Sequence, residues 1–277
     1  MSQRTITRRV RGIDTNDGAG VKLKRIIGQP NLDMLDPFLL LDEFRSDQAN
    51  DYIAGFPEHP HRGFETVTYM LAGHMRHGDN HGNRGDLGPG SVQWMTAGRG
   101  ILHSEMPQQE NGLMWGFQLW VNLPAADKMT APRYQDIAPE RIPQVQPAPG
   151  VDVRVIAGSL GDAVGPVQGV ATAPVYLDVA LAAGARFEIE LPAAHHAFAY
   201  VFEGPSAEVG GEPLARGELA VLSDGDRLTV AAGTAAARLL VVAGRPLRES
   251  VARYGPFVMN TPAQIQEAIA DFRAGRF

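Results

Sequence analysis

The sequence predicts an all-β protein built from sandwich- or barrel-like domains. Short apolar stretches, divided by glycine and proline, recur at even spacing through both halves of the chain. Only one stretch, near the C-terminus, has apolar residues at helical spacing. With 277 residues, the chain can form one large or two medium domains with a sizeable core. Its hydrophobic fraction of 44% and charged fraction of 20% are typical of a soluble globular protein.

In the first half, the expected strands alternate with turns rich in glycine, asparagine and aspartate. The apolar run from Asp36 to Phe44 suits a strand buried on both faces at least as well as a helix. The segment from Leu87 to Met95 is predicted as a turn followed by a strand. The other strands predicted in this half are residues 8–13, 21–27, 66–72 and 115–123.

The stretch from Pro124 to Gly150 is rich in proline, which fixes φ and removes a backbone donor. We therefore expect a first domain at residues 1–135, a Pro-rich linker at 136–150 and a second domain at 151–277. Strands in the second half are predicted at residues 151–158, 175–181, 185–191, 197–203, 220–223, 227–231 and 237–243.

A helix is predicted at the C-terminal end of the second domain. Thr261 suits its N-cap and Pro262 its first position. Gly275 would end it. The residues that would pack the helix against the body of that domain are Ile265, Ala268, Ile269 and Phe272.

Two pairs of metal-binding side chains have i,i+2 spacing: His59 with His61, and His103 with Glu105. Residues two apart in a strand share a face, so two such strands side by side would bring three imidazoles and a carboxylate to one point. A single His-x-His pair is a weak signal, because exposed histidines at that spacing are common. The second pair, which ends a strand-like run, makes a mononuclear metal site the better interpretation.

Four further residues are of types that can bind a metal. Glu65 falls in the same phase as His61, so it is either a ligand or a group that orients an imidazole. His74, His77 and His81 lie in a stretch dense in Gly, Asn and Asp, which predicts solvent-facing turn histidines without a role.

In the second half, His195 and His196 are adjacent, so in a strand they face opposite ways. No second His/Glu pair follows them. We therefore expect the second domain to hold no metal.

Composition excludes several classes of function. The net charge of −6 and the lack of a Lys/Arg cluster argue against direct nucleic-acid binding. With no cysteine, there are no disulfides or thiolate ligands, so any metal site uses nitrogen and oxygen alone. The N-terminus lacks the apolar run of a secretory signal, and no stretch approaches the ~18 apolar residues of a membrane helix. These features predict a cytoplasmic protein without a membrane partner.

Several motifs together resemble the pirin family of two-domain cupins, over nearly the whole chain. The most specific is Phe56 to Tyr69, which is close to the first motif of that family, and Gln93 to Pro107 is similar to the second. Supporting matches are Asp36 to Asp42, Leu119 to Pro124, and Tyr254 to Thr261.

The resemblance implies a bicupin, with two antiparallel β-barrel (jelly-roll) domains face to face, plus the C-terminal helix. It implies that His59, His61, His103 and Glu105 hold one divalent metal ion in the N-terminal barrel. The carboxylate after the last histidine then takes the ligand place that Glu65 has in the general cupin pattern. In this family the C-terminal barrel has usually lost its metal.

Two functions from different classes follow from the resemblance. The first is a quercetin 2,3-dioxygenase-type enzyme that binds a small aromatic, flavonol-like substrate and O₂ and releases carbon monoxide. Glu105 would then be both ligand and catalytic base. The alternative is a non-enzymatic, iron-dependent redox-sensing regulator that binds a transcription factor or metabolic enzyme. Fe(II) is the ion that the resemblance favours, while the donor set also suits Mn, Co, Ni, Cu or Zn.

Overall fold

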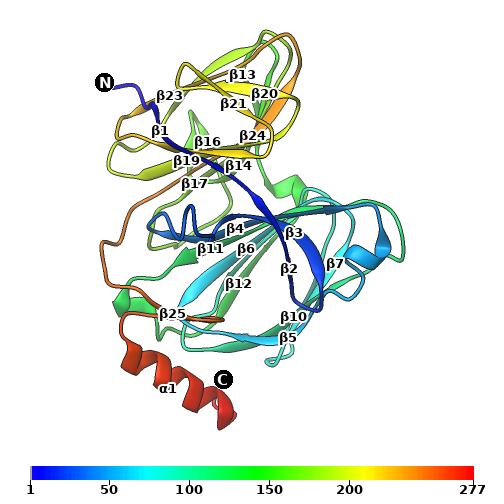
Figure 1. Ribbon diagram of the computed structural model, residues 1–277, viewed down its shortest axis with the longest axis vertical. Coiled ribbons are helices and arrows are strands. Elements are labelled where there is room, and N and C mark those ends of the chain that lie inside the picture. The colour runs from blue at the N-terminus through cyan, green and yellow to red at the C-terminus, as the bar shows by residue number, and fades with distance from the viewer. Residues whose placement is uncertain (1) are drawn as a thin grey trace. The chain divides into compact units, whose positions relative to one another are not determined.

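The computed structural model describes residues 2–277, and contacts within the chain divide it into two compact β-barrel units (Figure 1). The histidine barrel, which contains the His/Glu pairs, comprises Ile13–Gln29, Phe38–Pro139 and Leu247–Phe277. The aliphatic barrel comprises the N-terminal segment to Gly12, together with Pro30–Pro37 and Glu140–Pro246. Both are cupin barrels, as the resemblance implied.

The units are not the consecutive segments expected from the sequence. The N-terminal strand β1 (Ile6–Arg11) pairs with β22 (Glu218–Leu222), so the start of the chain completes the barrel formed mainly by the second half. The C-terminal segment from Leu247 belongs instead to the barrel formed mainly by the first half. These pairings over more than 200 residues leave no mark in local sequence patterns, which is why the expected boundaries differ.

The histidine barrel contains a seven-stranded and a four-stranded antiparallel sheet. Its strands are β2 (Ile13–Asp17), β3 (Val21–Ile27), β4 (Phe38–Ser46), β5 (Phe56–His61), β6 (Phe64–Ala72), β7 (Met75–Asp79), β8 (Arg84–Leu87), β9 (Val92–Thr96), β10 (Ile101–Pro107), β11 (Met114–Asn122), β12 (Arg133–Ile137), β25 (Ala252–Tyr254) and β26 (Phe257–Met259). The large sheet has the order β12-β9-β6-β11-β4-β3-β2, and the small sheet has the order β5-β10-β7-β8. Strand β4 is buried at seven consecutive positions, which confirms a strand covered on both faces.

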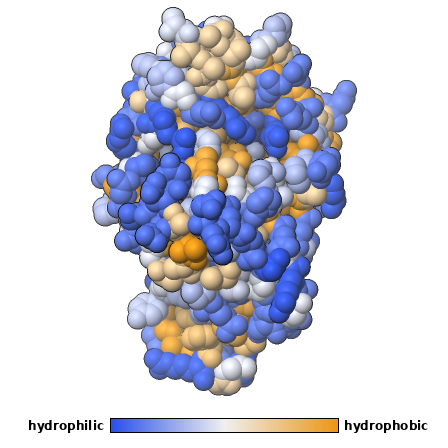
Figure 2. Space-filling model, turned by 90° about the vertical axis from the view of Figure 1, so that its right-hand side faces the viewer, coloured by the Kyte–Doolittle hydropathy of each residue, from blue (hydrophilic) through white to orange (hydrophobic). Residues whose placement is uncertain are grey.

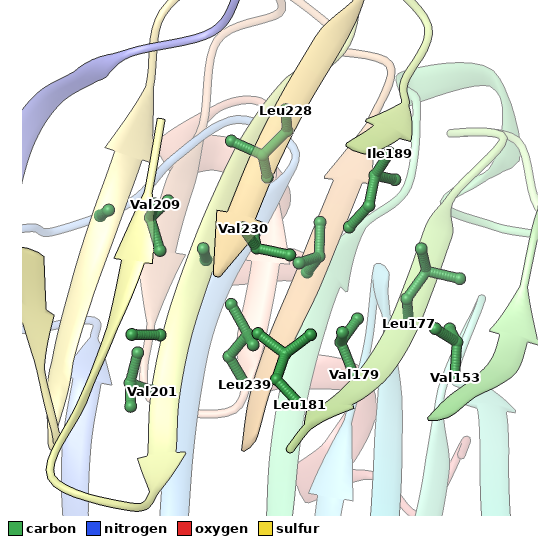
Figure 3. Packing of buried hydrophobic residues seen from close by; sticks show 14 of the residues in the cluster. Val153, Leu177, Val179, Leu181, Ile189, Val201, Val209, Leu228, Val230 and Leu239 are labelled. Carbon is green, nitrogen blue, oxygen red and sulfur yellow. The ribbon is translucent and has the colours of Figure 1, made fainter. Parts of the chain in front are cut away.

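The aliphatic barrel has the same kind of sheet pair. Its further strands are β13 (Gln144–Ala148), β14 (Val151–Ala157), β15 (Ser159–Leu160), β16 (Ala163–Val164), β17 (Val175–Leu181), β18 (Arg186–Glu190), β19 (His196–Glu203), β20 (Ser206–Val209), β21 (Glu212–Ala215), β23 (Arg227–Ala232) and β24 (Ala237–Gly244). The sheets have the orders β1-β22-β19-β24-β17-β14-β13 and β18-β23-β20-β21. Valine, leucine, isoleucine and alanine side chains from both sheets fill the interior (Figure 3).

The proline-rich stretch expected to be a linker contributes β12 and β13 to the sheets. Both strands lie at a sheet edge, where one row of backbone donors needs no partner strand. Proline is tolerated there, because its missing N–H can face away from the neighbouring strand. Proline content alone therefore does not separate a linker from an edge strand.

The C-terminal helix α1 (Pro262–Arg273) is formed as predicted, with Thr261 as its N-cap. The Thr261 hydroxyl accepts from the Gln264 backbone N–H, and the Gln264 side chain accepts from the Thr261 N–H, so the cap is a complete capping box. Ile265 and Ala268 of the helix are buried in one cluster with residues of β26. The helix therefore packs within the histidine barrel, and not on the second domain as expected.

The face shown in Figure 2 is mostly polar. Figure 2 shows hydrophilic side chains over most of the visible face, with apolar ones in smaller groups among them. Such groups are ordinary for a folded chain, because polar side chains alone cannot cover it. Within residues 2–277, no helix is both long and apolar enough to cross a membrane.

Candidate metal centre

The two predicted ligand pairs lie on neighbouring strands of the small sheet in the histidine barrel. Strand β5 carries His59 and His61, and β10 carries His103 and Glu105. The strands are antiparallel, and His59 is directly opposite His103. The register then shifts, so that Glu105 lies opposite Phe56. This irregularity offsets the carboxylate along β10 from the histidine pair.

The structure brings the three imidazoles together. Donor atoms of His59, His61 and His103 lie within 4.8 Å of one another. The ring centroid of His103 is 4.4 Å from that of His59 and 4.9 Å from that of His61. The Nε2 atoms of His59 and His61 are 3.0 Å apart. Two nitrogens bound at right angles to one ion, each by a bond of about 2.1 Å, would be separated by about 3 Å, so this spacing fits a shared metal.

The protonation of the imidazoles also fits metal binding. His59 Nδ1 is 2.8 Å from the Pro57 carbonyl oxygen, to which it donates, and this contact directs Nε2 of the ring toward His61 Nε2. The pKa values of His61 and His103 are well below the usual value. Burial is the main cause, and the neighbouring imidazoles add to it. Neutral imidazole is the form that binds metal.

Several ring nitrogens at this site have no hydrogen-bond partner. These are Nδ1 of His61 and both nitrogens of His103, all buried from solvent. An unsatisfied buried polar atom costs free energy unless a ligand supplies the missing bond. A metal ion bound through Nε2 of His59 and of His61 would also bind one of the orphaned His103 nitrogens, so the nitrogen-rich donor set fits a metal ion, which the cluster and its strand positions would hold.

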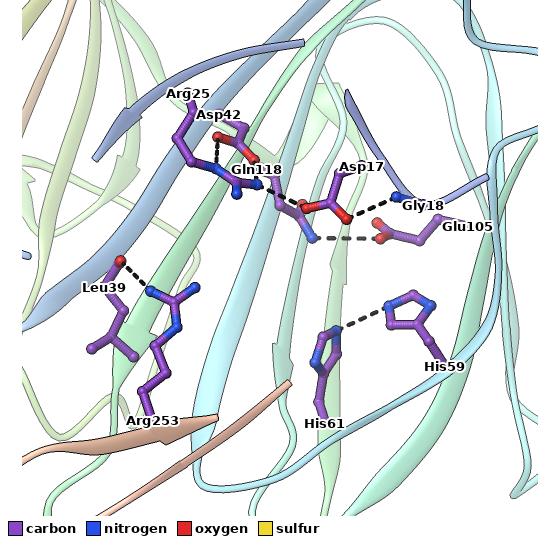
Figure 4. A network of polar contacts seen from close by, with 10 residues as sticks. All are labelled: Asp17, Gly18, Arg25, Leu39, Asp42, His59, His61, Glu105, Gln118 and Arg253. Carbon is purple, nitrogen blue, oxygen red and sulfur yellow. Dashed lines mark hydrogen bonds and ion pairs between the residues drawn. The ribbon is translucent and has the colours of Figure 1, made fainter. Parts of the chain in front are cut away.

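Glu105 lies beside the imidazoles but outside their tight group. Its side chain is buried, and Oε1 is 2.8 Å from the hydroxyl oxygen of Thr68. Gln118 Nε2 is 3.4 Å from Glu105 Oε2 (Figure 4). The carboxyl group is thus held by two neutral side chains of the large sheet, and not by another charge.

A cavity of about 580 Å³ opens beside the cluster, with His59, His61 and Glu105 in its wall. Aromatic and aliphatic side chains line much of the remainder, among them Phe56 and Trp120. The indole of Trp120 packs edge-on against His61, with ring centroids 5.3 Å apart. The cavity is large enough for a bicyclic or tricyclic aromatic ligand.

Comparison with known proteins assigns the chain to a family. The Pirin family model matches residues 20–121, and the model of the Pirin C-terminal cupin domain matches residues 176–277. A pirin-like protein of Caulobacter vibrioides is 50% identical over 100% of both chains. This chain belongs to the pirin family. Human pirin is 42% identical over 98% of this chain and 93% of its own. A crystal structure of a quercetin 2,3-dioxygenase from Acinetobacter baumannii has a TM-score of 0.91 at 35% identity, over 100% of this chain and 99% of that one.

One histidine of this pirin-family chain lies where sequence reasoning did not expect it. His77 belongs to strand β7 and is 1% exposed, so the prediction of a solvent-facing turn residue was wrong for it. It pairs with Glu105 in the β10–β7 register, and its ring centroid is 5.9 Å from that of His103. Both of its ring nitrogens lack a hydrogen-bond partner. His74 and His81 are exposed, as predicted.

The signal that could have revealed His77 is alternation. Met75, His77 and Asp79 share one strand face, and the turn begins only after them. Glu65, in contrast, faces away from the imidazoles: its Oε1 accepts from Thr96 Oγ1 at 2.7 Å, and burial raises its pKa. The role of orienting an imidazole therefore finds no support in its contacts.

Buried cations brace the end of β5 next to the ligands. Arg62, directly after His61, donates from NH1 to Asp271 of α1 at 2.7 Å, and its guanidinium lies 4.4 Å from the Phe277 ring centroid. Lys128 donates to the carbonyl oxygens of Gly63 and Val258 at 2.7 and 3.0 Å. A Cβ on Gly63, where φ is +88°, would lie 2.0 Å from the Val258 oxygen, so only glycine allows this approach. The ligand strand is thus fixed to the C-terminal segment.

Proposed function

We propose that this chain is a metal-dependent dioxygenase that opens flavonols such as quercetin, with incorporation of O₂ and release of carbon monoxide. The observation that carries the proposal is the combination of three converging imidazoles with a cavity of about 580 Å³ at their side. Cavities that bind small molecules are typically about 300–1,000 Å³. The quercetin 2,3-dioxygenase of A. baumannii, with 35% identity over the full chain, supports the same assignment.

His59, His61, His103 and Glu105 would hold the ion, with Fe(II) as the proposed metal. Three nitrogens and one carboxylate oxygen suit iron, and also Mn, Co, Ni, Cu or Zn. When bound, the ion supplies Lewis acidity toward the flavonol 3-hydroxyl and a redox-active centre for O₂. The protein residues position the flavonol, exclude water and handle its proton.

Glu105 is the proposed proton acceptor for the flavonol hydroxyl. Its neighbours form a network that a protonated Glu105 completes. The Thr68 hydroxyl oxygen lies 2.8 Å from Glu105 Oε1 and 2.6 Å from Gln118 Oε1, but it has one hydrogen to donate. With the Gln118 amide in its present orientation, a protonated Glu105 donates to Thr68, Thr68 donates to Gln118 Oε1, and Gln118 Nε2 donates to Glu105 Oε2.

An ionised Glu105 changes this network. If Thr68 then donates to Glu105, its hydroxyl oxygen and Gln118 Oε1 face each other at 2.6 Å without a hydrogen between them. The network is therefore complete when Glu105 holds a proton, which suits a group that accepts the flavonol proton during the reaction.

The cavity wall suits a planar aromatic ligand. Phe44, Phe56, Leu40 and Trp120 supply apolar surface, which desolvates the flavonol rings and keeps water from the reacting centre. A regulator that senses only the oxidation state of its ion needs the same ligands but no such cavity. The cavity is the feature that favours the enzyme over this alternative.

The test is the stoichiometry of carbon monoxide release and O₂ uptake with quercetin. Iron-reconstituted protein should release one CO per O₂ consumed, and the apo form and the Glu105→Ala variant should release none. His81→Ala, which changes an exposed histidine of the same barrel, is the matched control and should keep full activity. Protein with one iron per chain that releases no CO would rule out the quercetinase function.

A further inference from the structure

Phe277, in the segment that follows α1, contacts groups next to both predicted ligand pairs. Its ring centroid lies 4.4 Å from the guanidinium carbon of Arg62, the residue directly after His61. The same ring fills the space beside Gly100, the last residue before β10. One aromatic side chain therefore lies at the end of one ligand strand and at the start of the other.

The contact with Gly100 depends on the missing side chain. A Cβ on Gly100, which is buried and has a φ of +139°, would lie 2.8 Å from Phe277 Cγ and 2.9 Å from Cδ1. These atoms form the base of the ring, which a small side-chain rotation cannot move away, so only glycine leaves room for it. The adjoining carbonyl oxygen of Arg99 accepts a hydrogen bond from Nε of Arg62. The ring thus packs where the end of β5 and the loop before β10 are already joined.

The main chain of Phe277 makes a second connection to β10, through Asn80. Nδ2 of Asn80 donates to the main-chain oxygen of Phe277 at 3.0 Å. Asn80 also exchanges two hydrogen bonds with Leu102: its backbone N–H donates to the Leu102 carbonyl oxygen at 3.0 Å, and its Oδ1 accepts from the Leu102 N–H at 3.2 Å. Leu102 directly precedes His103. The ring and the main chain of Phe277 are therefore both connected to the strands that carry the imidazoles.

Two further rings fix the position of the Phe277 side chain. Phe257 of β26 and Phe272 of α1 each have their ring centroid 5.7 Å from that of Phe277, in edge-to-face or tilted arrangements. The centroids of Phe257 and Phe272 are 6.2 Å apart, so the three rings form one cluster. Arg62 and Gly100 thus pack against a ring that is itself held by the helix and by β26.

The pairing between the two ligand strands is irregular at the site itself. Strand β5 pairs with β10 in one register as far as His103, and the register shifts before Glu105. A disrupted ladder fixes the relative position of two strands less closely than a continuous one. We propose that Phe277 is a positioning residue for the metal centre: it holds the end of β5 and the start of β10 at a fixed separation, and so aligns the imidazole of β10 with the two imidazoles of β5. The inference rests on the proposed function, because it requires a metal ion at this cluster.

The test measures zinc affinity and the geometry of the bound ion in the 277-residue chain. Phe277→Ala should weaken zinc affinity about tenfold, measured by competition with a zinc-binding dye, because a group that orients metal ligands is lost. With cobalt(II) at saturation, the visible d–d bands of this variant should differ from those of wild type in position and intensity. Phe277→Tyr keeps the ring and should retain the wild-type affinity and spectrum. A role in stability alone would not change the spectrum of the saturated protein.

Phe272→Ala is the matched control. It removes a ring of the same cluster, but Phe272 packs on the other two rings and is 38% exposed. Zinc affinity and the cobalt spectrum should stay those of wild type. Asn80→Asp tests the main-chain connection, because it keeps the oxygen that accepts from Leu102 and loses the donor to Phe277. Zinc affinity should fall about fivefold in this variant, the range of one hydrogen bond.

The contrary outcomes are distinct from a failure of the proposed function. Equal loss of affinity in Phe277→Ala and Phe272→Ala would mean that the cluster acts only through stability, which overturns the inference. An unchanged cobalt spectrum in Phe277→Ala would mean that Phe277 does not set the ligand geometry, while the three-imidazole site stands. If His103→Ala binds zinc as tightly as wild type, the metal centre itself is wrong, and the role of Phe277 is wrong with it.

Discussion

The two barrels have closely similar strand topology, but the interior of one is polar at the small sheet and the interior of the other is apolar there. Their small sheets, β5-β10-β7-β8 and β18-β23-β20-β21, repeat one order of strands along the chain. In the histidine barrel, the first two of these strands carry three imidazoles and a carboxylate. At the same place in the aliphatic barrel, β18 and β23 carry Ile189, Leu228 and Val230, all fully buried. Closing a barrel of this topology therefore does not require a polar interior, and the polar interior of the histidine barrel fits the metal site proposed above.

The barrels also differ in how this sheet is stabilised. The aliphatic barrel uses continuous apolar packing. Around the ligand strand, the histidine barrel uses buried cations with full sets of partners, such as Lys128 with three oxygen acceptors. Buried charge is tolerated where every donor is satisfied, and it fixes geometry more closely than apolar contact does. The predictions below test this contrast, in order of decreasing effect.

Removing one imidazole should affect metal binding alone. His103→Ala is expected to weaken metal affinity by about 1,000-fold, or ~4 kcal/mol, because a ligand in a buried cluster is lost. Competition with a chromogenic chelator measures this affinity. His196→Ala, in the aliphatic barrel, should keep the affinity of wild type. Equal loss in both variants would mean that the metal does not reside at the three-imidazole cluster.

A substitution in the aliphatic barrel should have the opposite effect: it should lower stability and leave metal binding unchanged. Leu228→Ala should lower the free energy of unfolding by about 3 kcal/mol, since it leaves a cavity in a close-packed interior. Metal content per folded chain should not change. Urea denaturation followed by elemental analysis checks both statements, and metal loss from the folded variant would show that the barrels are not independent in this respect.

The anchor between the ligand strand and α1 should matter for both stability and metal. Asp271→Asn is expected to cost about 2 kcal/mol of unfolding free energy, because the buried guanidinium of Arg62 loses its charged partner. Metal affinity should fall about tenfold, since Arg62 adjoins His61. Arg276 also bonds Asp271 but is exposed, so Arg276→Ala should cost no more than about 0.5 kcal/mol. Equal effects of the two substitutions would contradict the anchoring role of Arg62.

Lys128 should give the histidine barrel a distinct pH dependence. Burial lowers the pKa of Lys128 to about 8, while an unfolded lysine titrates near ~10.4. Between these values the unfolded chain binds more protons, so the free energy of unfolding rises with pH, by up to ~1.4 kcal/mol per pH unit. Denaturation of the apo protein from pH 8 to 10 should show this rise relative to Lys128→Met. A difference between the two proteins that is independent of pH would refute it.

Spacing in the sequence was enough to bring out the candidate ligands. His59, His61 and His103 converge because strand alternation and a single β5–β10 pairing determine their positions. The extended conformation and burial of β4 were likewise predictable from a continuous apolar run. These are local patterns, and the antiparallel pairing of β5 with β10 brings the residues that carry them to one site.

Features that depend on pairing between residues far apart in the chain could not be predicted from the sequence. The Gly, Asn and Asp residues around His77 predict a turn, but the register of β7 against β10 places His77 inside the barrel. Two partners of Arg62, Asp271 and Phe277, lie about 200 residues further along the chain. Nothing local distinguishes an arginine that meets an aspartate at that separation from one that faces solvent.

The interleaving of the two barrels has a consequence for synthesis on the ribosome. Strand β1 can pair only after β22 has been made, and Arg62 gains Asp271 and Phe277 as partners only after the C-terminal segment has been made. The two sheets of the histidine barrel, in contrast, lie within residues 13–137 and contain every predicted metal ligand. On the nascent chain, β1 therefore stays unpaired, and the imidazole cluster lacks these contacts, until the second half has been made.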